Sequence, residues 1–191
     1  MHPVGILLCA GRGARFDPTG ATSKLLATLP GGETVAGASA RRLRAVLPNV
    51  IAVVRPGDDA LAAQLRTAGC DILVCPDAHL GMAASLVCAV HARPAPFGWI
   101  VALGDMPWVL PSTVQALWDA LADGASIAAP TFGGQRGNPV GFAPEHRAAL
   151  LALEGDQGAR GLLATHPVTL VPVDDPGILR DIDERDDLYP A

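Results

Sequence analysis

The chain has 191 residues, of which 50% are hydrophobic and only 4% aromatic, and its formal net charge is −5. This length suits one domain with an aliphatic core, so we expect residues 1–191 to form a single domain. The negative charge argues against a nucleic-acid-binding surface, which needs a basic face, but not against a small basic pocket for a phosphorylated ligand. No apolar run is long enough to span a membrane.

Short apolar runs alternate with helical patterns along most of the chain. Strands are predicted at 4–10, 50–54, 71–75, 99–103, 126–130 and 168–173, and helices at 35–46, 58–68, 82–91 and 111–121. Thr34 is the expected cap of the first helix, Gly69 closes the second, and Pro111 opens the fourth. The strands are continuously apolar, which indicates burial on both faces. We therefore predict a Rossmann-like three-layer α/β/α sandwich with a mostly parallel sheet.

The four cysteines, Cys9, Cys70, Cys75 and Cys88, are scattered among apolar residues and form no C-x-x-C pair. We interpret them as buried free thiols rather than metal ligands or disulfides. The first residues also lack the basic stretch and cleavage site of a signal peptide, so we expect a cytoplasmic protein. No Ser-His-Asp arrangement can be argued from the sequence.

A glycine-rich loop with basic residues follows the first predicted strand. It matches neither standard phosphate-binding pattern, because Phe16 stands where the dinucleotide motif needs its third glycine and Leu25 follows the lysine. Glycine backbone can still approach phosphate oxygens, and the cations supply charge. Lys24 is the only lysine beside 13 arginines, which favours a role that needs a compact ammonium. The alternative is a solvated lysine on a loop. The loop residues of interest are Gly11, Arg12, Gly13, Arg15 and Lys24.

Carboxylates occur at two places where a metal could bind. Asp105 follows the fourth strand, at the edge of the sheet where ligands bind in such folds. A carboxylate beside nucleotide phosphates normally holds Mg²⁺, although a turn cap before Pro107 is an equally ordinary use of aspartate. Asp181 and Asp183, two apart, would share a face of an extended segment and could complete the metal site with Asp105. The alternative is an acidic, solvated chain end.

The stretch "GMAASL" follows the third strand. Gly81, Ala83 and Ala84 are small enough to let a flat base or a ribose lie against the backbone, and Ser85 offers a hydroxyl. An ordinary helix start is the alternative.

Taken together, these segments resemble a known family. "LLCAGRGARF…SKLL" resembles the L-A-A-G-x-G-x-R-M…K-x-L signature of nucleotidyltransferases with the MobA-like NTP transferase fold. "GMAASL", "LGDMP", "RGNPVGF", "LEGDQGAR" and "DIDERDDL" resemble, in the same order, stretches of molybdenum cofactor cytidylyltransferases. The resemblance covers nearly the whole chain.

The resemblance implies a reaction in which a substrate phosphate attacks the α-phosphate of a nucleoside triphosphate in line and pyrophosphate leaves. It implies Mg²⁺ as the cofactor, held by Asp105 with Asp181 or Asp183, and catalytic roles for Lys24, Arg15 and Asp105. The nucleotide would be bound by Ala10, Gly11, Arg12, Gly13, Arg15, Lys24 and Ser85. Asn138, Asp156 and Arg160 would face the acceptor.

The reaction expected from the resemblance joins CTP to molybdopterin-bound molybdenum cofactor, and a molybdoenzyme or its chaperone would be a further partner. A guanylyltransferase, or a transferase for another phosphate such as phospholactate or a sugar phosphate, is the rival within the class. A non-catalytic molybdopterin carrier is the rival outside it, but a carrier needs neither Lys24 nor Asp105. Three departures from the family pattern matter most. Eight residues separate Arg15 from Lys24, Asn138 replaces a histidine, and Gly104 replaces an alanine.

Overall fold

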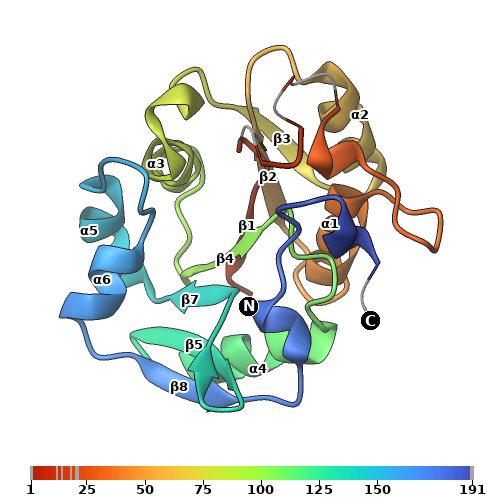
Figure 1. Cartoon of the computed structure of the whole chain (residues 1–191). Helices are drawn as coiled ribbons and strands as arrows, with labels where there is room; N and C mark the ends of the chain where they lie inside the picture. The colour runs from red at the N-terminus through yellow and green to blue at the C-terminus, as the bar shows by residue number, and fades with distance from the viewer. Residues whose placement is uncertain (1, 12, 14, 18, 20–21, 190–191) are drawn as a thin grey trace.

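The computed structural model describes residues 2–11, 13, 15–17, 19 and 22–189 (Figure 1). One sheet contains every strand of these residues, in the order β3-β2-β1-β4-β7-β5-β6, with β8 paired to β5. The strands are β1 (Val4–Leu8), β2 (Val50–Val54), β3 (Asp71–Val74), β4 (Trp99–Leu103), β5 (Ile127–Phe132), β6 (Gln135–Arg136), β7 (Val140–Phe142) and β8 (Thr169–Pro172). The α-helices are α1 (Val35–Arg44), α2 (Asp59–Thr67), α3 (Met82–Ala92), α4 (Pro111–Ala122), α5 (Arg147–Leu151) and α6 (Arg160–Thr165).

The sheet is mostly parallel, as predicted. The pairs β1–β2, β1–β4, β2–β3 and β5–β8 are parallel. Only the pairs that involve β6 or β7 are antiparallel among the described strands. From the sequence, no strand is predicted between 131 and 167, and this was wrong: the glycine-rich stretch from Phe132 to Phe142 contains both of these strands. Strands of two and three residues are too short to show a periodicity.

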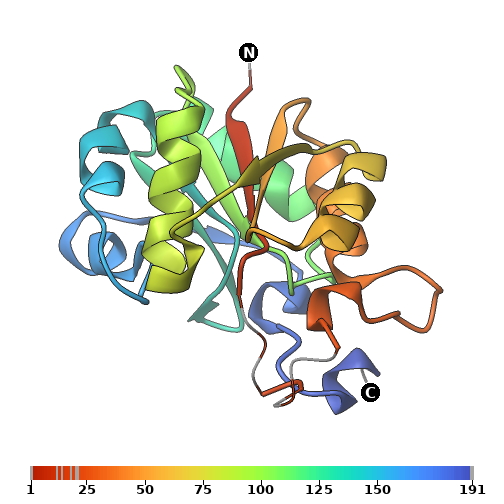
Figure 2. The same ribbon diagram turned by 90° about the horizontal axis from the view of Figure 1, so that it is seen from above.

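Each face of the sheet carries its own hydrophobic core because successive side chains of a strand point to opposite faces. Leu7, Val50, Ala52 and Ile100 pack under α1, α2 and α4, whereas Ile6, Ile51, Val53 and Trp99 pack under α3, α5 and α6. Figures 1 and 2 show these two groups of helices on opposite sides of the sheet. This arrangement is the predicted three-layer sandwich.

The edge strand β3 departs from the prediction of burial on both faces, since Val74 is 48% exposed. The predicted helix signals are present. The Thr34 hydroxyl accepts a hydrogen bond from the Gly37 backbone N–H at the start of α1, and Gly69 after α2 has a φ of 88°, which favours glycine. No helix of the described residues is both long and apolar enough to cross a membrane.

The four cysteines are free thiols, as predicted, and all but Cys88 are buried. Burial raises the pKa of the Cys9 thiol well above its ordinary value and the pKa of the Cys70 thiol to about 11.

Candidate active site

A cavity of about 310 Å³ opens beyond the carboxyl ends of β1 and β4, where ligands bind in such sheets. The loop that follows β1 forms one side of it, and the start of α3 forms the other. Its lining includes eight of the predicted site residues: Ala10, Gly11, Gly13, Lys24, Ser85, Asp105, Asp156 and the predicted base-facing Gly81. Arg12, also predicted to bind nucleotide, lies outside the described residues.

Lys24 lines the cavity although eight residues separate it from Arg15 in the sequence, and the described residues of this stretch include a turn. Asp17 organises the turn: its carboxylate accepts hydrogen bonds from the Thr19 N–H and hydroxyl and from the Thr22 N–H. These bonds, the Thr19 hydroxyl first, lower the pKa of Asp17 to about 2. Phe16 is buried, and the Arg185 guanidinium lies over its ring.

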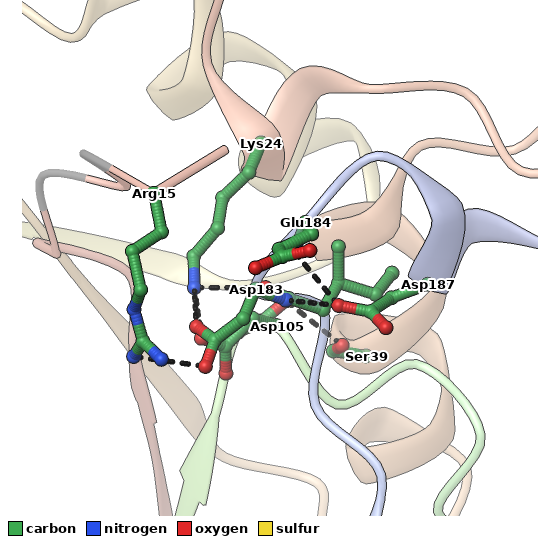
Figure 3. A network of polar contacts seen from close by, with 9 residues as sticks. Arg15, Lys24, Ser39, Asp105, Asp183, Glu184 and Asp187 are labelled. Carbon is green, nitrogen blue, oxygen red and sulfur yellow. Dashed lines mark hydrogen bonds and ion pairs between the residues drawn. The ribbon is translucent and has the colours of Figure 1, made fainter. Parts of the chain in front are cut away.

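Lys24 begins a short 3₁₀ turn (η1, Lys24–Leu26) and points inward (Figure 3). Its side chain passes directly beside Gly13, which has a φ of 62°; a Cβ there would lie 3.3 Å from the lysine Cγ. The ammonium donates to Asp105 Oδ2 at 2.7 Å, to the Ile182 carbonyl at 2.9 Å and to Asp183 Oδ1 at 3.4 Å. The side chain is only 10% exposed.

Asp183 forms ion pairs with both of the basic side chains that the structure describes in the loop, Arg15 and Lys24. Arg15 lies 2.8 Å from its second oxygen, although the arginine side chain itself is 75% exposed. Asp187 fixes the backbone here, because its carboxylate accepts from the N–H groups of Asp183 and Glu184. These two bonds lower the pKa of Asp187.

Asp105 is held in place from both sides by backbone contacts. The Ile182 N–H donates to the Asp105 carbonyl at 2.9 Å. The buried Ser39 hydroxyl of α1 donates to the carbonyl of Gly104, the preceding residue, at 3.0 Å. Two segments distant in sequence, α1 and the segment around Ile182, therefore fix the position of this aspartate.

Asp105, Asp181 and Asp183 each place one carboxylate oxygen within 4.8 Å of the corresponding oxygens of the other two. Burial, and then the neighbouring charge of Asp183, raises the pKa of Asp181. Three carboxylates form the hard oxygen donor set that Mg²⁺ and Mn²⁺ prefer. The residues present thus fit a divalent cation, and the structure brings together the three that the sequence had grouped.

The residues predicted to face the acceptor divide between two neighbouring cavities. Asp156 lines the first cavity and packs against Gly81, whose φ of 123° admits no side chain here. Asn138 and Arg160 line a second cavity of about 80 Å³, which is otherwise mainly apolar. The two cavities share three lining residues: Leu8, Met82 and Leu103.

Sequence reasoning missed three residues that shape the site: Ser39, Ile182 and Asp187. Ser39 and Ile182 contact backbone or side-chain groups far away in sequence, so their residue types give no signal. Asp187 does carry a sequence signal. Aspartate side chains commonly accept hydrogen bonds from backbone N–H groups three or four residues earlier in the chain.

A Rossmann-like sheet with a glycine loop, a largely shielded lysine and three carboxylates at its ligand-binding edge defines a phosphate-handling α/β protein of the nucleotidyltransferase kind. The model of the MobA-like NTP transferase domain matches residues 5–171. The chain therefore belongs to this family. No protein of curated function matches it in sequence.

Solved structures agree with this fold. The chain is similar to Rv0371c of Mycobacterium tuberculosis H37Rv, with 29% identity, a TM-score of 0.83, and coverage of 98% of this chain and 95% of that one. A structure of Rv0371c in complex with manganese gives 26% identity and a TM-score of 0.78, with coverage of 98% and 96%. Molybdopterin-guanine dinucleotide biosynthesis protein A of Archaeoglobus fulgidus shares the fold at 20% identity and a TM-score of 0.69, with coverage of 97% and 94%.

Proposed function

We propose that this chain transfers a nucleoside monophosphate, with CTP as the preferred donor, to the terminal phosphate of molybdopterin-bound molybdenum cofactor and releases pyrophosphate. One observation carries the proposal. The Lys24 ammonium and the Asp105 carboxylate lie 2.7 Å apart, and both line the first cavity. A molybdopterin carrier has no need for this pair. We further propose that residues 1–191 act as one domain and in the cytoplasm.

The chemistry needs positioning and charge neutralisation more than a side-chain base, since the attacking group is already an anionic phosphate. The backbone at Gly11 and Gly13 can approach the triphosphate closely, and Arg15 is exposed enough to reach it. Lys24 would neutralise the charge that develops on the attacked phosphate. Ala10 and Ser85, on the cavity wall, would lie against base and ribose.

Asp105, Asp181 and Asp183 would hold Mg²⁺, as supported by their oxygen donor set and by the manganese complex of the similar Rv0371c. When bound, the cation would neutralise phosphate charge and orient the leaving pyrophosphate. Asp105 would supply a ligand from the loop that follows β4, and Asp181 and Asp183 would supply ligands from the acidic segment.

In our proposal the second cavity receives part of the acceptor. Its lining is mainly apolar, with Asn138, Gln157 and Arg160 as the polar groups that could bind the acceptor's polar atoms. The arginine would receive the acceptor's anionic group.

The proposal is tested by thermal shift with CTP, GTP, ATP and UTP, each with and without Mg²⁺, followed by pyrophosphate release with the acceptor. A nucleotide at 100 times its Kd should stabilise the fold by about 2.7 kcal/mol. A shift that requires both CTP and Mg²⁺, together with pyrophosphate release, supports the proposal. If molybdopterin binds but no nucleotide shifts the melting temperature, the protein is a carrier instead.

A further inference from the structure

Lys24 stands at the place among the carboxylates where a divalent cation would have to bind. We infer that its ammonium is the resident counter-ion of this acidic cluster, and that a divalent cation enters by displacing the ammonium from Asp105. The released ammonium then turns to the phosphates of the nucleotide. The first part concerns metal binding alone, and the last part rests on the proposed function.

The contacts show how fully the ammonium is engaged. Its three donors meet three acceptors, Asp105, Asp183 and the Ile182 carbonyl, at 2.7, 3.4 and 2.9 Å. Both carboxylates are partly shielded, with 20% and 26% exposure. Without a cation between them, these negative charges would repel one another in a site of lowered dielectric. The lysine therefore supplies the attraction that a metal would otherwise supply.

The two cations cannot share the same carboxylate oxygen at low cost. A Mg²⁺ bound to Asp105 Oδ2 at about 2.1 Å could lie no further than about 5 Å from an ammonium held 2.7 Å from that oxygen. Repulsion over so short a distance is weakly screened when the groups are partly buried. Metal and ammonium thus compete for Asp105.

The lysine has room to leave without unfolding the loop. Its stem passes beside Gly13, where a Cβ would lie 3.3 Å from the lysine Cγ, and its side chain already lines the nucleotide cavity. Rotation about the flexible stem can carry the ammonium from the carboxylates into this cavity. By thermodynamic linkage, a nucleotide that attracts the ammonium must raise the affinity for the metal, and the metal must raise the affinity for the nucleotide equally.

The first experiment uses the unmodified chain, because Lys24 is its only lysine. Selective ¹³C,¹⁵N-lysine labelling gives a spectrum with a single set of side-chain signals. Titration with Mg²⁺ alone should shift the Cε and Nζ signals of Lys24 saturably. If Mg²⁺ binds, as shown by calorimetry, and these signals do not move, the inference is wrong.

The second experiment measures Mn²⁺ affinity without nucleotide, by the electron paramagnetic resonance of free Mn²⁺. Lys24→Met keeps most of the stem and removes the charge, so it should bind Mn²⁺ about five- to a hundredfold more tightly than wild type. CTP should then enhance Mn²⁺ binding less in the variant than in wild type. The matched control is Arg93→Ala, which removes an exposed ion pair with Asp71 and should leave the affinity unchanged.

Equal or weaker Mn²⁺ binding by a folded Lys24→Met variant would overturn the inference, because the lysine would then assemble the carboxylates rather than occupy their site. The two proposals fail separately. A chain whose lysine signals respond to Mg²⁺ but which binds no nucleotide contradicts the proposed function only. A chain that transfers CMP with unresponsive lysine signals contradicts the displacement only.

Discussion

The Cys9 side chain lies against Gly104 beside the site, and the residue type at each position accounts for the residue type at the other. Both stand where the family signature that the chain resembles has alanine. A Cβ on Gly104 would lie 2.5 Å from Cys9 Sγ, closer than real Cβ atoms approach. The cysteine thus fills the space that an alanine methyl at position 104 would take.

This pairing predicts a compensated double substitution. Gly104→Ala should lower the free energy of unfolding, because the methyl meets the sulfur, and Cys9→Ala in the same chain should restore part of the loss. Residues in contact typically show coupling energies of roughly 0.5–3 kcal/mol. Urea denaturation of the four proteins gives the cycle. Strictly additive effects would show that the two residues do not compete for space.

Asp105 supports a prediction about turnover. Asp105→Asn keeps the shape and removes the charge that holds the Lys24 ammonium and, in our proposal, the metal. We expect pyrophosphate release to fall by about 10²–10³ or more, the range found when a group that stabilises developing charge is removed. Asp71→Asn, an exposed aspartate at the other end of the sheet, is the control. Normal turnover by a folded Asp105→Asn variant would remove Asp105 from the mechanism.

At the scale of the element, the loop between Arg15 and Lys24 gains its shape from Asp17. The pKa of this carboxyl is about 2 in the folded chain against an ordinary 3.8. A depressed pKa contributes stability that is complete above about pH 4 and is lost as the pH falls toward 2. The loop should therefore loosen in acid sooner than the sheet.

The corresponding variant is Asp17→Asn, which cannot lose a proton. The difference in melting temperature between wild type and this variant should shrink as the pH is lowered from 5 to about 2. Asp123→Asn, an exposed carboxylate at the end of α4, should show no such trend. A difference that stays constant with pH would mean that the carboxylate charge does not hold the turn.

The elements that the sequence predicted correctly are those with a long, repeated pattern. The apolar runs of β1, β2 and β4 and the helix pattern from Val35 to Arg44 gave the layers and the parallel sheet. The short β6, β7, α5 and α6 were missed because two to six residues do not complete enough turns or alternations to give a signal. Asp105, Asp181 and Asp183 could be grouped from their place after strands and their spacing. The Ile182 carbonyl could not, because every residue has one.

At the scale of the whole molecule, our proposal places the nucleotide in the first cavity, which has a volume of about 310 Å³. The base preference is predicted from the "GMAASL" stretch at the start of α3, which resembles cytidylyltransferases.

We expect kcat/KM for CTP to exceed that for GTP with the same acceptor. A site built to pair with the hydrogen-bonding groups of one base discriminates strongly, since the wrong base leaves those groups unpaired. Competition between the two nucleotides in one reaction gives the ratio directly. A preference for GTP would place the chain with the guanylyltransferases.

The acidic segment that completes the site also completes one of the two hydrophobic cores. The last strand ends at Pro172, whereas Asp181, Ile182 and Asp183 follow it. During synthesis, the strands and α-helices of the described residues are therefore made before two of the three carboxylates. The core under α1, α2 and α4 also contains Ile182 and Leu188, which are 0% and 8% exposed. A nascent chain that stops before Asp181 would therefore lack part of this core as well as two carboxylates of the metal site, so quality control that recognises exposed core would also detect the incomplete site.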